Sequence, residues 1–302
     1  MPTPQKQVAL VVGASRGIGR QIAIDLAKEG YAALPPDPNS RDSTISTVAR
    51  EIQLAGGTAS PIAVDVRSPT SIQALVSQTI SIYGRLDVLV YNSGAIWWSS
   101  VANTPLKRFQ LMQQVNVEGL YATLQASLPH FEKKGAGGGE GEWKGRIIVV
   151  SPPIYSRFFR GKAAYAVGKV GMSVLTKGLA MDFQREGKAG MAVTSIWPAT
   201  AIQSAATQNL AREDARELRH ASIFSDAVVA MIKAPVEEVN GELLLDEDFL
   251  RTKGVSDFEK YSVVPMATPR RIMPVEFPDL RVREQDDEGR RMDSAKLRAA
   301  KL

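Results

Sequence analysis

The sequence predicts an α/β protein whose core is a doubly wound parallel sheet. From residue 8 to about residue 246, short apolar runs alternate with longer segments of helical periodicity. The apolar runs are nearly continuous, which is typical of strands that helices bury on both faces. The alternation predicts strands at 8–12, 60–64, 86–91, 146–150, 192–196 and 241–245, and helices near 17–29, 43–55, 70–83, 105–133, 162–186 and 222–233.

The second strand of this sheet is expected to be stunted or missing. After the first helix only the four residues 31–34 are available, and they are followed by Pro35, Pro36 and Pro38. Proline has no backbone N–H and cannot donate to a sheet ladder. Any strand at this position must therefore end by Leu34.

Two of the expected helices carry start signals. Ser68-Pro69 and Thr104-Pro105 each place a hydroxyl that can cap a helix before a proline suited to its first turn. The alternation stops near residue 246, and the chain loses most of its regular pattern beyond about residue 260. We therefore expect one domain over 1–260 and an extended tail over 261–302, where little helical or strand pattern remains.

Composition limits the kind of protein. The 302 residues include 44% hydrophobic residues and no cysteine, which excludes disulfides and thiolate chemistry. The only two histidines, His130 and His220, lie far apart, so no metal site is expected. The net charge of +5 comes from bases mixed with acids, so no nucleic-acid partner is expected. No apolar run approaches the roughly 18 residues that predict a membrane span.

A glycine-rich turn follows the first strand. Gly13-Ala14-Ser15-Arg16-Gly17-Ile18-Gly19 leads directly into the first helix. Glycines allow a tight turn and close approach of the backbone, and the helix N-terminus offers free N–H groups to a pyrophosphate. The pattern predicts a Rossmann-type dinucleotide site at Gly13, Ser15, Arg16, Gly17, Ile18 and Gly19, with a purely structural turn as the alternative.

A tyrosine and a lysine stand four residues apart in an expected helix. This spacing places Tyr165 and Lys169 on one helix face. Reduction of a carbonyl by hydride transfer needs a proton for the developing alkoxide. A free tyrosine has a pKa near 10, and a neighbouring ammonium together with a cationic nicotinamide brings that pKa toward the working range. The pair is therefore a candidate for acid–base catalysis.

Taken in order, these motifs resemble those of the short-chain dehydrogenase/reductase family. The resemblance lies in the glycine spacing, Asp65-Val66, Asn92 and Gly94 after the fourth strand, an asparagine at 116 and the Tyr165–Lys169 pair. The resemblance implies adenine contacts at Asp65 and Val66, further cofactor contacts at Asn92, Gly94, Pro198, Tyr165 and Lys169, and a catalytic role for Asn116. It also implies homodimers or homotetramers formed through the helices at 105–133 and 162–186. The sequence departs from the family at Tyr91 and Ser93.

The catalytic serine is displaced in this sequence. In the family it usually lies thirteen residues before the tyrosine, where this chain has Pro152. We expect Ser151, one residue earlier, to donate to the substrate carbonyl, the alternative being that it only closes the strand. Ser151-Pro152-Pro153 also resembles one particular branch of the family.

The cofactor and substrate can be narrowed further. Arg16 could pair with a 2′-phosphate, and no acid ends a second strand, so NADP is favoured over NAD. Apolar walls are expected from residues 197–204 and from Ile96, Trp97, Trp98, Phe158 and Phe159. The expected activity interconverts an apolar, lipid-like ketone and alcohol. The alternative is a catalytically silent dinucleotide-binding or scaffold protein, which Pro152, Tyr91 and the shortened second strand would favour.

The last three residues are Ala300-Lys301-Leu302. They resemble the small–basic–Leu tripeptide that a peroxisomal import receptor reads. The sequence therefore predicts this receptor as a partner and the peroxisome as the location, with the cytoplasm as the alternative.

Overall fold

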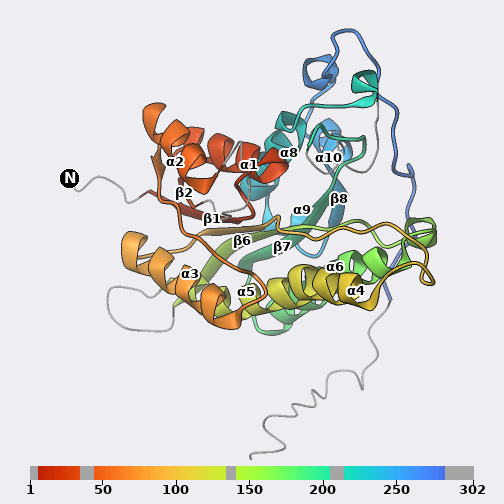
Figure 1. The fold of residues 1–302 in the computed structure, drawn as a ribbon. Coiled ribbons are helices and arrows are strands. Elements are labelled where there is room, and N and C mark those ends of the chain that lie inside the picture. The colour runs from red at the N-terminus through yellow and green to blue at the C-terminus, as the bar shows by residue number, and fades with distance from the viewer. Residues whose placement is uncertain (1–5, 35–43, 134–140, 205–213, 283–302) are drawn as a thin grey trace, which may run out of the picture.

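The computed structural model describes residues 6–34, 44–133, 141–204 and 214–282. They form a doubly wound α/β sheet (Figure 1), which confirms the predicted fold class. Seven parallel strands follow the order β3-β2-β1-β4-β6-β7-β8, and the short β5 pairs antiparallel with β6. The strands are β1 (Val8–Val12), β2 (Ala32–Leu34), β3 (Thr58–Ala59), β4 (Val88–Tyr91), β5 (Glu132–Lys133), β6 (Glu142–Val150), β7 (Gly190–Trp197) and β8 (Leu243–Leu245).

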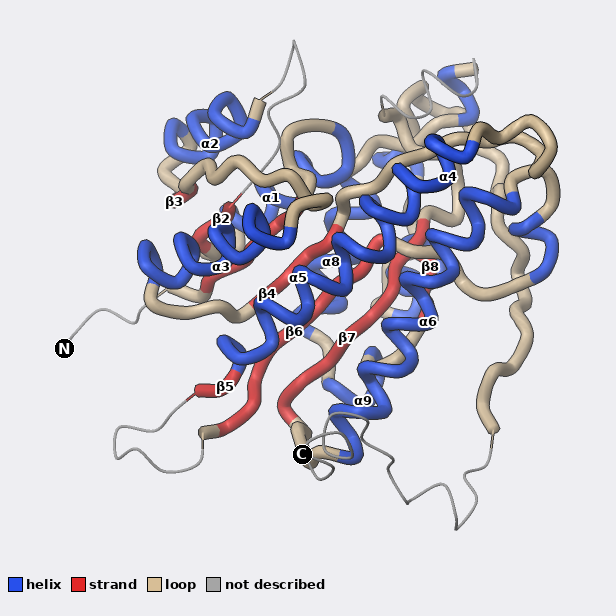
Figure 2. Tube along the Cα trace, turned by 60° about the horizontal axis from the view of Figure 1, so that its bottom comes forward, coloured by secondary structure: helices blue, strands red, loops and turns tan. Residues whose placement is uncertain are grey.

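The longer helices form one layer on each face of the sheet (Figure 1). One layer holds α1 (Gly17–Lys28), α2 (Ile45–Leu54), α8 (Ser222–Lys233) and α10 (Asp246–Thr252). The other holds α3 (Pro69–Tyr83), α4 (Leu106–Gln113), α5 (Gly119–Ser127) and α6 (Ala163–Arg185), and Figure 2 shows α3, α5 and α6 in front of the strands. The short α9 (Val236–Val239) precedes β8.

Each strand supplies side chains to two cores. In β1, Ala9 and Val11 pack in the core that includes α1 and α8, while Leu10 and Val12 pack in the core of the α3, α5 and α6 layer. All five β1 residues are buried. This two-sided burial explains why the strands appear in the sequence as uninterrupted apolar runs.

The second strand is present but stunted. Ala32 and Ala33 pair with both β1 and β3, and Leu34 pairs with β1 alone. The third strand was placed wrongly: it lies at Thr58–Ala59, not at 60–64. Pro61 has no N–H for a ladder, so the apolar residues beyond it run outside the sheet.

The expected long helix at 105–133 is broken. A π-helical turn, η1 (Gln114–Glu118), separates α4 from α5, and a 3₁₀ turn, η2 (Leu128–Phe131), follows at Pro129. The predicted cap at Ser68 is confirmed, since its hydroxyl accepts from the backbone N–H of Ser71. The cap at Thr104 is wrong, because that hydroxyl donates to the carbonyl of Ser100 and Pro105 takes the N-cap position.

Residues 262–282 run along the edge of the sheet where the parallel strands end, from the α10 layer toward the α4 and α6 layer (Figure 1). Arg271 makes a double hydrogen bond to Asp248 of α10, at 2.5 and 2.6 Å. Further along, Met273 is buried and Phe277 packs edge-on against Tyr155. Ala300–Leu302 lies outside the described residues. Among the described helices, none is both long and apolar enough to cross a membrane.

Candidate active site

The predicted site residues gather where the parallel strands end. The glycine turn follows β1, Asn92 follows β4, Ser151 follows β6 and Pro198 follows β7. These strands are neighbours in the sheet, so the loops that leave them meet at one edge. In doubly wound folds this edge is where ligands bind.

The glycine turn is held by close backbone packing. Gly13 has φ +90°, and a Cβ added there would lie 2.7 Å from the backbone N of Ser93. A Cβ at Gly19 would lie 2.2 Å from the carbonyl oxygen of Gly13. The side-chain amide of Asn92 donates to that same carbonyl oxygen at 2.8 Å. Asn92 therefore fixes the turn to the end of β4.

The start of α1 fits a pyrophosphate. The N-cap residue Arg16 makes no side-chain cap hydrogen bond to the first turn of the helix, whose N–H groups are of the kind that bind phosphates. The Arg16 side chain is exposed beside them, and Ser15 is buried within the turn. The segment after β7 reaches the same place, because a Cβ added at Gly17 would lie 3.6 Å from that of Ser204.

Asp65 lies in the loop between β3 and α3. Arg67 binds its carboxylate through the side chain at 2.7 and 2.8 Å and through its backbone N–H at 3.0 Å. These hydrogen bonds hold the pKa of Asp65 at about 2, so the group is an ionised acceptor at neutral pH. The carbonyl of Val66, next in the chain, approaches α5 at Gly119.

Asn116 lies in the π turn η1 and is fully buried. Its side-chain amide makes two hydrogen bonds to the backbone of Ala95, accepting from N at 2.9 Å and donating to O at 3.1 Å. The Tyr91 hydroxyl donates to the carbonyl of Val115 at 2.6 Å. The tyrosine that departs from the family pattern thus ties β4 to the turn that carries Asn116.

Tyr165 and Lys169 project from α6 and are 3% and 5% exposed. The Lys169 ammonium donates to the carbonyl of Val150, at the end of β6, over 2.8 Å. A Cβ added at Gly94 would lie 3.2 Å from Lys169 Nζ and 3.5 Å from Asn116 Oδ1. Side chains from η1 and α6 therefore converge beside an exposed glycine of the loop after β4.

Burial changes the protonation of this pair. It lowers the pKa of Lys169 to about 7 and raises the pKa of Tyr165 above its usual value. In the unliganded protein the tyrosine therefore keeps its proton at neutral pH. Desolvation is the cause of the raised tyrosine pKa, and the depression expected from Lys169 together with a cationic nicotinamide stays a prediction for the cofactor-bound protein.

Aromatic rings surround Tyr165. The ring centroids of Trp98 and Phe158 each lie 6.2 Å from its own, and Trp197 stacks edge-on against Phe158 at 5.9 Å. Ile96 packs against the same cluster, and Trp97, Trp98 and Phe159 are 37%, 47% and 38% exposed. Of the expected apolar wall residues, Ile96, Trp98, Phe158 and Trp197 therefore lie around the tyrosine.

One residue in this region was missed by the sequence reasoning. The Lys162 ammonium lies 4.8 Å from the ring centroid of Trp98 and 4.2 Å from that of Phe158, the two rings that contact Tyr165. Its position three residues before Tyr165, at the start of the same helix, was the available signal.

Ser151 follows β6 as expected, but it is buried and its hydroxyl is engaged inside the protein. Its hydroxyl is fully buried and lies 2.7 Å from the hydroxyl of Ser195 on β7, which in turn lies 2.8 Å from that of Thr176 on α6. The structure gives Ser151 a packing role between β6, β7 and α6. We therefore do not propose Ser151 as the donor to the substrate carbonyl.

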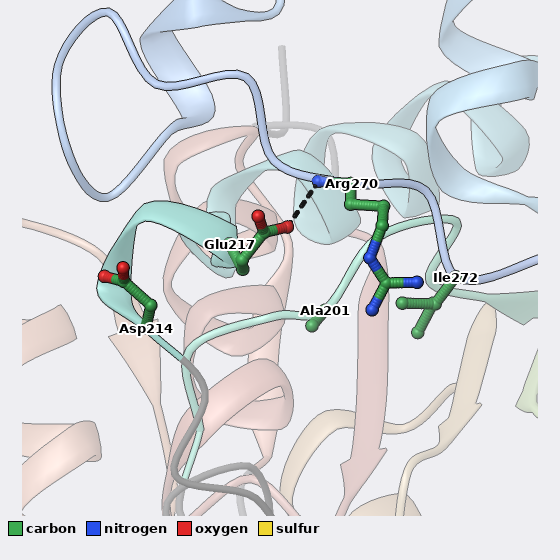
Figure 3. A pocket seen from close by; sticks show the side chains of 5 residues that line it. All are labelled: Ala201, Asp214, Glu217, Arg270 and Ile272. Carbon is green, nitrogen blue, oxygen red and sulfur yellow. Dashed lines mark hydrogen bonds between the residues drawn. The ribbon is translucent and has the colours of Figure 1, made fainter.

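A small cavity lies apart from these residues. It measures about 60 Å³, is lined by Ala201, Asp214, Glu217, Arg270 and Ile272, and includes a hydrogen bond from the Arg270 backbone to Glu217 (Figure 3). Ligand pockets for molecules of drug size measure roughly 300–1,000 Å³. Of the predicted site residues, Ala201 from the expected wall segment 197–204 lines this cavity, and none of the predicted catalytic or cofactor-binding residues does. Over the described ranges, no group of three or more His, Asp and Glu side chains could hold a metal ion.

The sheet order and the flanking helices place the chain in the class of doubly wound α/β proteins. The short chain dehydrogenase family matches residues 7–215, and the chain belongs to that family. In structure it is similar to a short chain dehydrogenase of Mycobacterium thermoresistibile, with a TM-score of 0.79 and 32% identity, covering 90% of this chain and 96% of the other.

Within the family, the branch that Ser151-Pro152-Pro153 indicated is that of hydroxysteroid dehydrogenase-like protein 2. The chain is 36% identical to that protein of Danio rerio and 35% identical to that of Homo sapiens. Both alignments extend over 263 residues and cover 84% of this chain. The chain spans about 60% of the length of these two relatives.

Proposed function

We propose that the protein reduces apolar ketones to alcohols with NADPH, with Tyr165 as the proton donor. The observation that carries the proposal is the convergence of Tyr165, Lys169 and Asn116 beside Gly94, next to the glycine turn. Family membership supports an NAD(P)-dependent oxidoreductase. The direction and the substrate class are inferred from the residues around Tyr165.

The described residues fit a dinucleotide. The uncapped start of α1 would hold the pyrophosphate, Asp65 and Val66 the adenine, and Lys169 the nicotinamide ribose beside Gly94. When bound, the dinucleotide supplies the hydride. Asn92 supports this arrangement by fixing the glycine turn, and Pro198 begins the segment that approaches α1 from β7.

The protonation of Tyr165 favours reduction. Burial raises the pKa of the tyrosine, so the neutral phenol is present at neutral pH and can donate its proton to the developing alkoxide. Lys169 is partly protonated near pH 7, and its ammonium would stabilise the phenolate that forms. Asn116 holds the backbone of Ala95 and so positions the loop that faces these groups.

The chemistry proceeds without the usual serine. Pro152 occupies the place of the family's serine and has no hydroxyl, and the Ser151 hydroxyl is engaged with Ser195. Removing one such donor typically costs about 10²–10³ in turnover. We therefore expect a slow enzyme that relies on Tyr165.

NADP is the cofactor we propose. The exposed guanidinium of Arg16 stands at the start of α1, where it could pair with a 2′-phosphate. A ribose 2′-hydroxyl would need an acid at the end of the second strand, and β2 ends at Leu34.

The deciding experiment follows NADPH oxidation against a panel of apolar ketones. Wild-type protein should turn over at least one, and Tyr165→Phe should lose activity by two orders of magnitude or more while binding NADPH with unchanged affinity. Equal turnover by both proteins would overturn the assignment of Tyr165. NADPH binding without turnover of any ketone would instead favour the silent dinucleotide-binding or scaffold protein.

We also propose a homodimer or homotetramer formed through α5 and α6. On α6, Val167, Val174 and Met181 are 57%, 57% and 43% exposed, and their spacing of seven places them on one helix face. Tyr121 of α5 is exposed as well. Exposed apolar patches of this kind often mark protein–protein contacts.

We further propose that Ala300-Lys301-Leu302 directs the protein to peroxisomes through the import receptor. The small–basic–Leu pattern supports this assignment. Removal of the three residues should shift a fluorescently tagged protein to the cytoplasm, and an unchanged location would exclude the assignment.

A further inference from the structure

The two segments that carry the site are strongly basic. Residues 88–117 and 143–181 contain no Asp or Glu, while they include nine Lys and Arg residues. This is unusual in a chain that has 32 acids against 37 bases. The charges that these two segments contribute are therefore of one sign.

Lys162 brings this charge to the catalytic tyrosine. Its ammonium is half-buried against Trp98 and Phe158, and both rings also contact Tyr165. The rings of Trp98 and Phe158 therefore lie between the Lys162 ammonium and the ring of Tyr165. It makes no ion pair with a carboxylate among the described residues.

A half-buried cation without an acid is costly, and the rings offset only part of the cost. Burial lowers the pKa of Lys162, and no acidic neighbour raises it again. A cation over an aromatic face gains roughly 0.5–2 kcal/mol, whereas a buried charge normally has a counter-ion. An anionic group bound beside Lys162 would offset the remaining cost of burying its ammonium.

Arg108 extends the cationic edge. Its guanidinium lies 4.7 Å from the ring centroid of Trp97, the neighbour of Trp98, and its side chain is exposed. Lys162 and Arg108 therefore stand on the two adjacent tryptophans of the loop after β4. The two tryptophans are the apolar part of this surface, and Lys162 and Arg108 add positive charge beside it.

We propose that Lys162 is an anion-binding residue of the substrate pocket and that the substrate is an apolar carbonyl compound bearing a carboxylate or phosphate group. This inference rests on the proposed reductase function and specifies its substrate class. The apolar part of the substrate packs on Trp98 and Phe158, its carbonyl faces Tyr165, and its anionic group binds Lys162, with Arg108 as a weaker outer contact.

The test compares matched pairs of ketones with NADPH. Medium-chain oxo-acids with the carbonyl at successive positions are measured beside their methyl esters, and a ketone with a phosphate monoester distinguishes the two anions. Wild-type protein should prefer the anionic member by about tenfold or more in kcat/KM. The larger of the carboxylate and phosphate preferences identifies the natural group.

The variants assign the preference to a residue. Lys162→Gln should abolish it through KM, leave methyl-ester turnover within about twofold and leave NADPH affinity unchanged, while Lys162→Arg should restore it. The control is Lys144→Gln, which removes the same charge from an exposed position at the opposite end of β6 and should keep the preference. Equal loss on acids and esters in Lys162→Gln, or no preference in the wild type, would overturn the inference.

A failure of the reductase proposal would look different. If wild-type protein reduces no ketone at all, calorimetric binding of an oxo-acid and its ester to the NADP-loaded protein still tests the anion site. Tighter binding of the acid in the wild type but not in Lys162→Gln supports the site, and equal binding excludes it.

Discussion

The hydroxyl oxygens of Ser151 and Ser195 lie 2.7 Å apart, joining the ends of β6 and β7 beneath α6. A second hydrogen bond joins Ser195 to Thr176 of α6. Ser151 and Ser195 are both fully buried. This connection fastens α6, which carries Tyr165 and Lys169, to the two strands under it. It also engages the Ser151 hydroxyl in a buried hydrogen bond.

Ser151→Ala should therefore affect stability more than catalysis. Loss of one buried hydrogen bond should lower the free energy of unfolding by about 1 kcal/mol. The kcat/KM for a ketone should fall less than about threefold, whereas removal of a true carbonyl donor costs about 10²–10³. Urea denaturation and steady-state kinetics measure the two effects.

Ser195→Ala is the matched variant, because it removes the other end of the same hydrogen bond. Ser195→Ala also removes the hydrogen bond to Thr176, so it should lower the free energy of unfolding by more than Ser151→Ala does, while both variants should keep kcat/KM within about threefold. A hundredfold loss of activity in Ser151→Ala alone would return the carbonyl-donor role to Ser151.

Lys169 should make stability depend on pH. Its pKa is about 7 in the folded protein against an ordinary value of 10.5, so between these values the unfolded chain binds more protons than the folded one. The cost of burying the ammonium is complete below pH 7 and is relieved as pH rises toward 10.5. For one proton the slope is at most about 1.4 kcal/mol per pH unit.

Lys169→Met should accordingly be more stable than the wild type at pH 7 while losing catalysis, and the difference in unfolding free energy should narrow by pH 9. Denaturant titrations of the unliganded proteins at several pH values measure it. The exposed Lys144→Met should follow the wild type at each pH. Parallel curves for wild type and Lys169→Met would show that Lys169 keeps an ordinary pKa.

Arg16→Gln should weaken NADPH binding by about tenfold and leave NADH binding nearly unchanged. A charge-assisted contact to the 2′-phosphate is lost, and NADH lacks that group. Fluorescence titration gives both affinities. Lys144→Gln, with the same change of net charge, controls for the general field of the protein, and equal losses for both dinucleotides would argue against a phosphate contact at Arg16.

Val174→Glu should dissociate the proposed oligomer. Val174 is the middle residue of the exposed α6 face formed by Val167, Val174 and Met181. A carboxylate there cannot be buried against a second copy without a large desolvation cost. Light scattering after size exclusion reads the mass directly. Leu54→Glu places the same charge on an exposed apolar residue of α2 and should leave the mass unchanged, while an unaltered mass in Val174→Glu would remove α6 from the interface.

The sequence predicted the fold well where burial alone determines structure. Strands β1, β4 and β7 are buried on both faces, so their apolar runs were visible without any partner. The third strand was misplaced because Ile62 and Val64 are apolar but lie beyond Pro61, and pairing with β2 ends at Ala59. The local apolar pattern does not show which residues pair with β2.

The site was predictable only in part for similar reasons. The spacing of Tyr165 and Lys169 follows from helix geometry, so it could be recognised in one dimension. The π turn at Asn116 depends on contacts such as that between Tyr91 and Val115, which join distant segments. The partner of Ser151 depends on the register of β6 with β7, where Val149 faces Ser195.

The docked segment over 271–277 has a consequence for how specificity can change. It follows the last strand and touches the site from outside, through Met273 and Phe277 on Tyr155, while Arg271 anchors it to α10. Substitutions there would change the side chains beside Tyr155 without altering the pairing of the seven parallel strands. The sheet and its cofactor loops can stay constant while this appended strip diversifies, so proteins with nearly identical cores need not share a substrate.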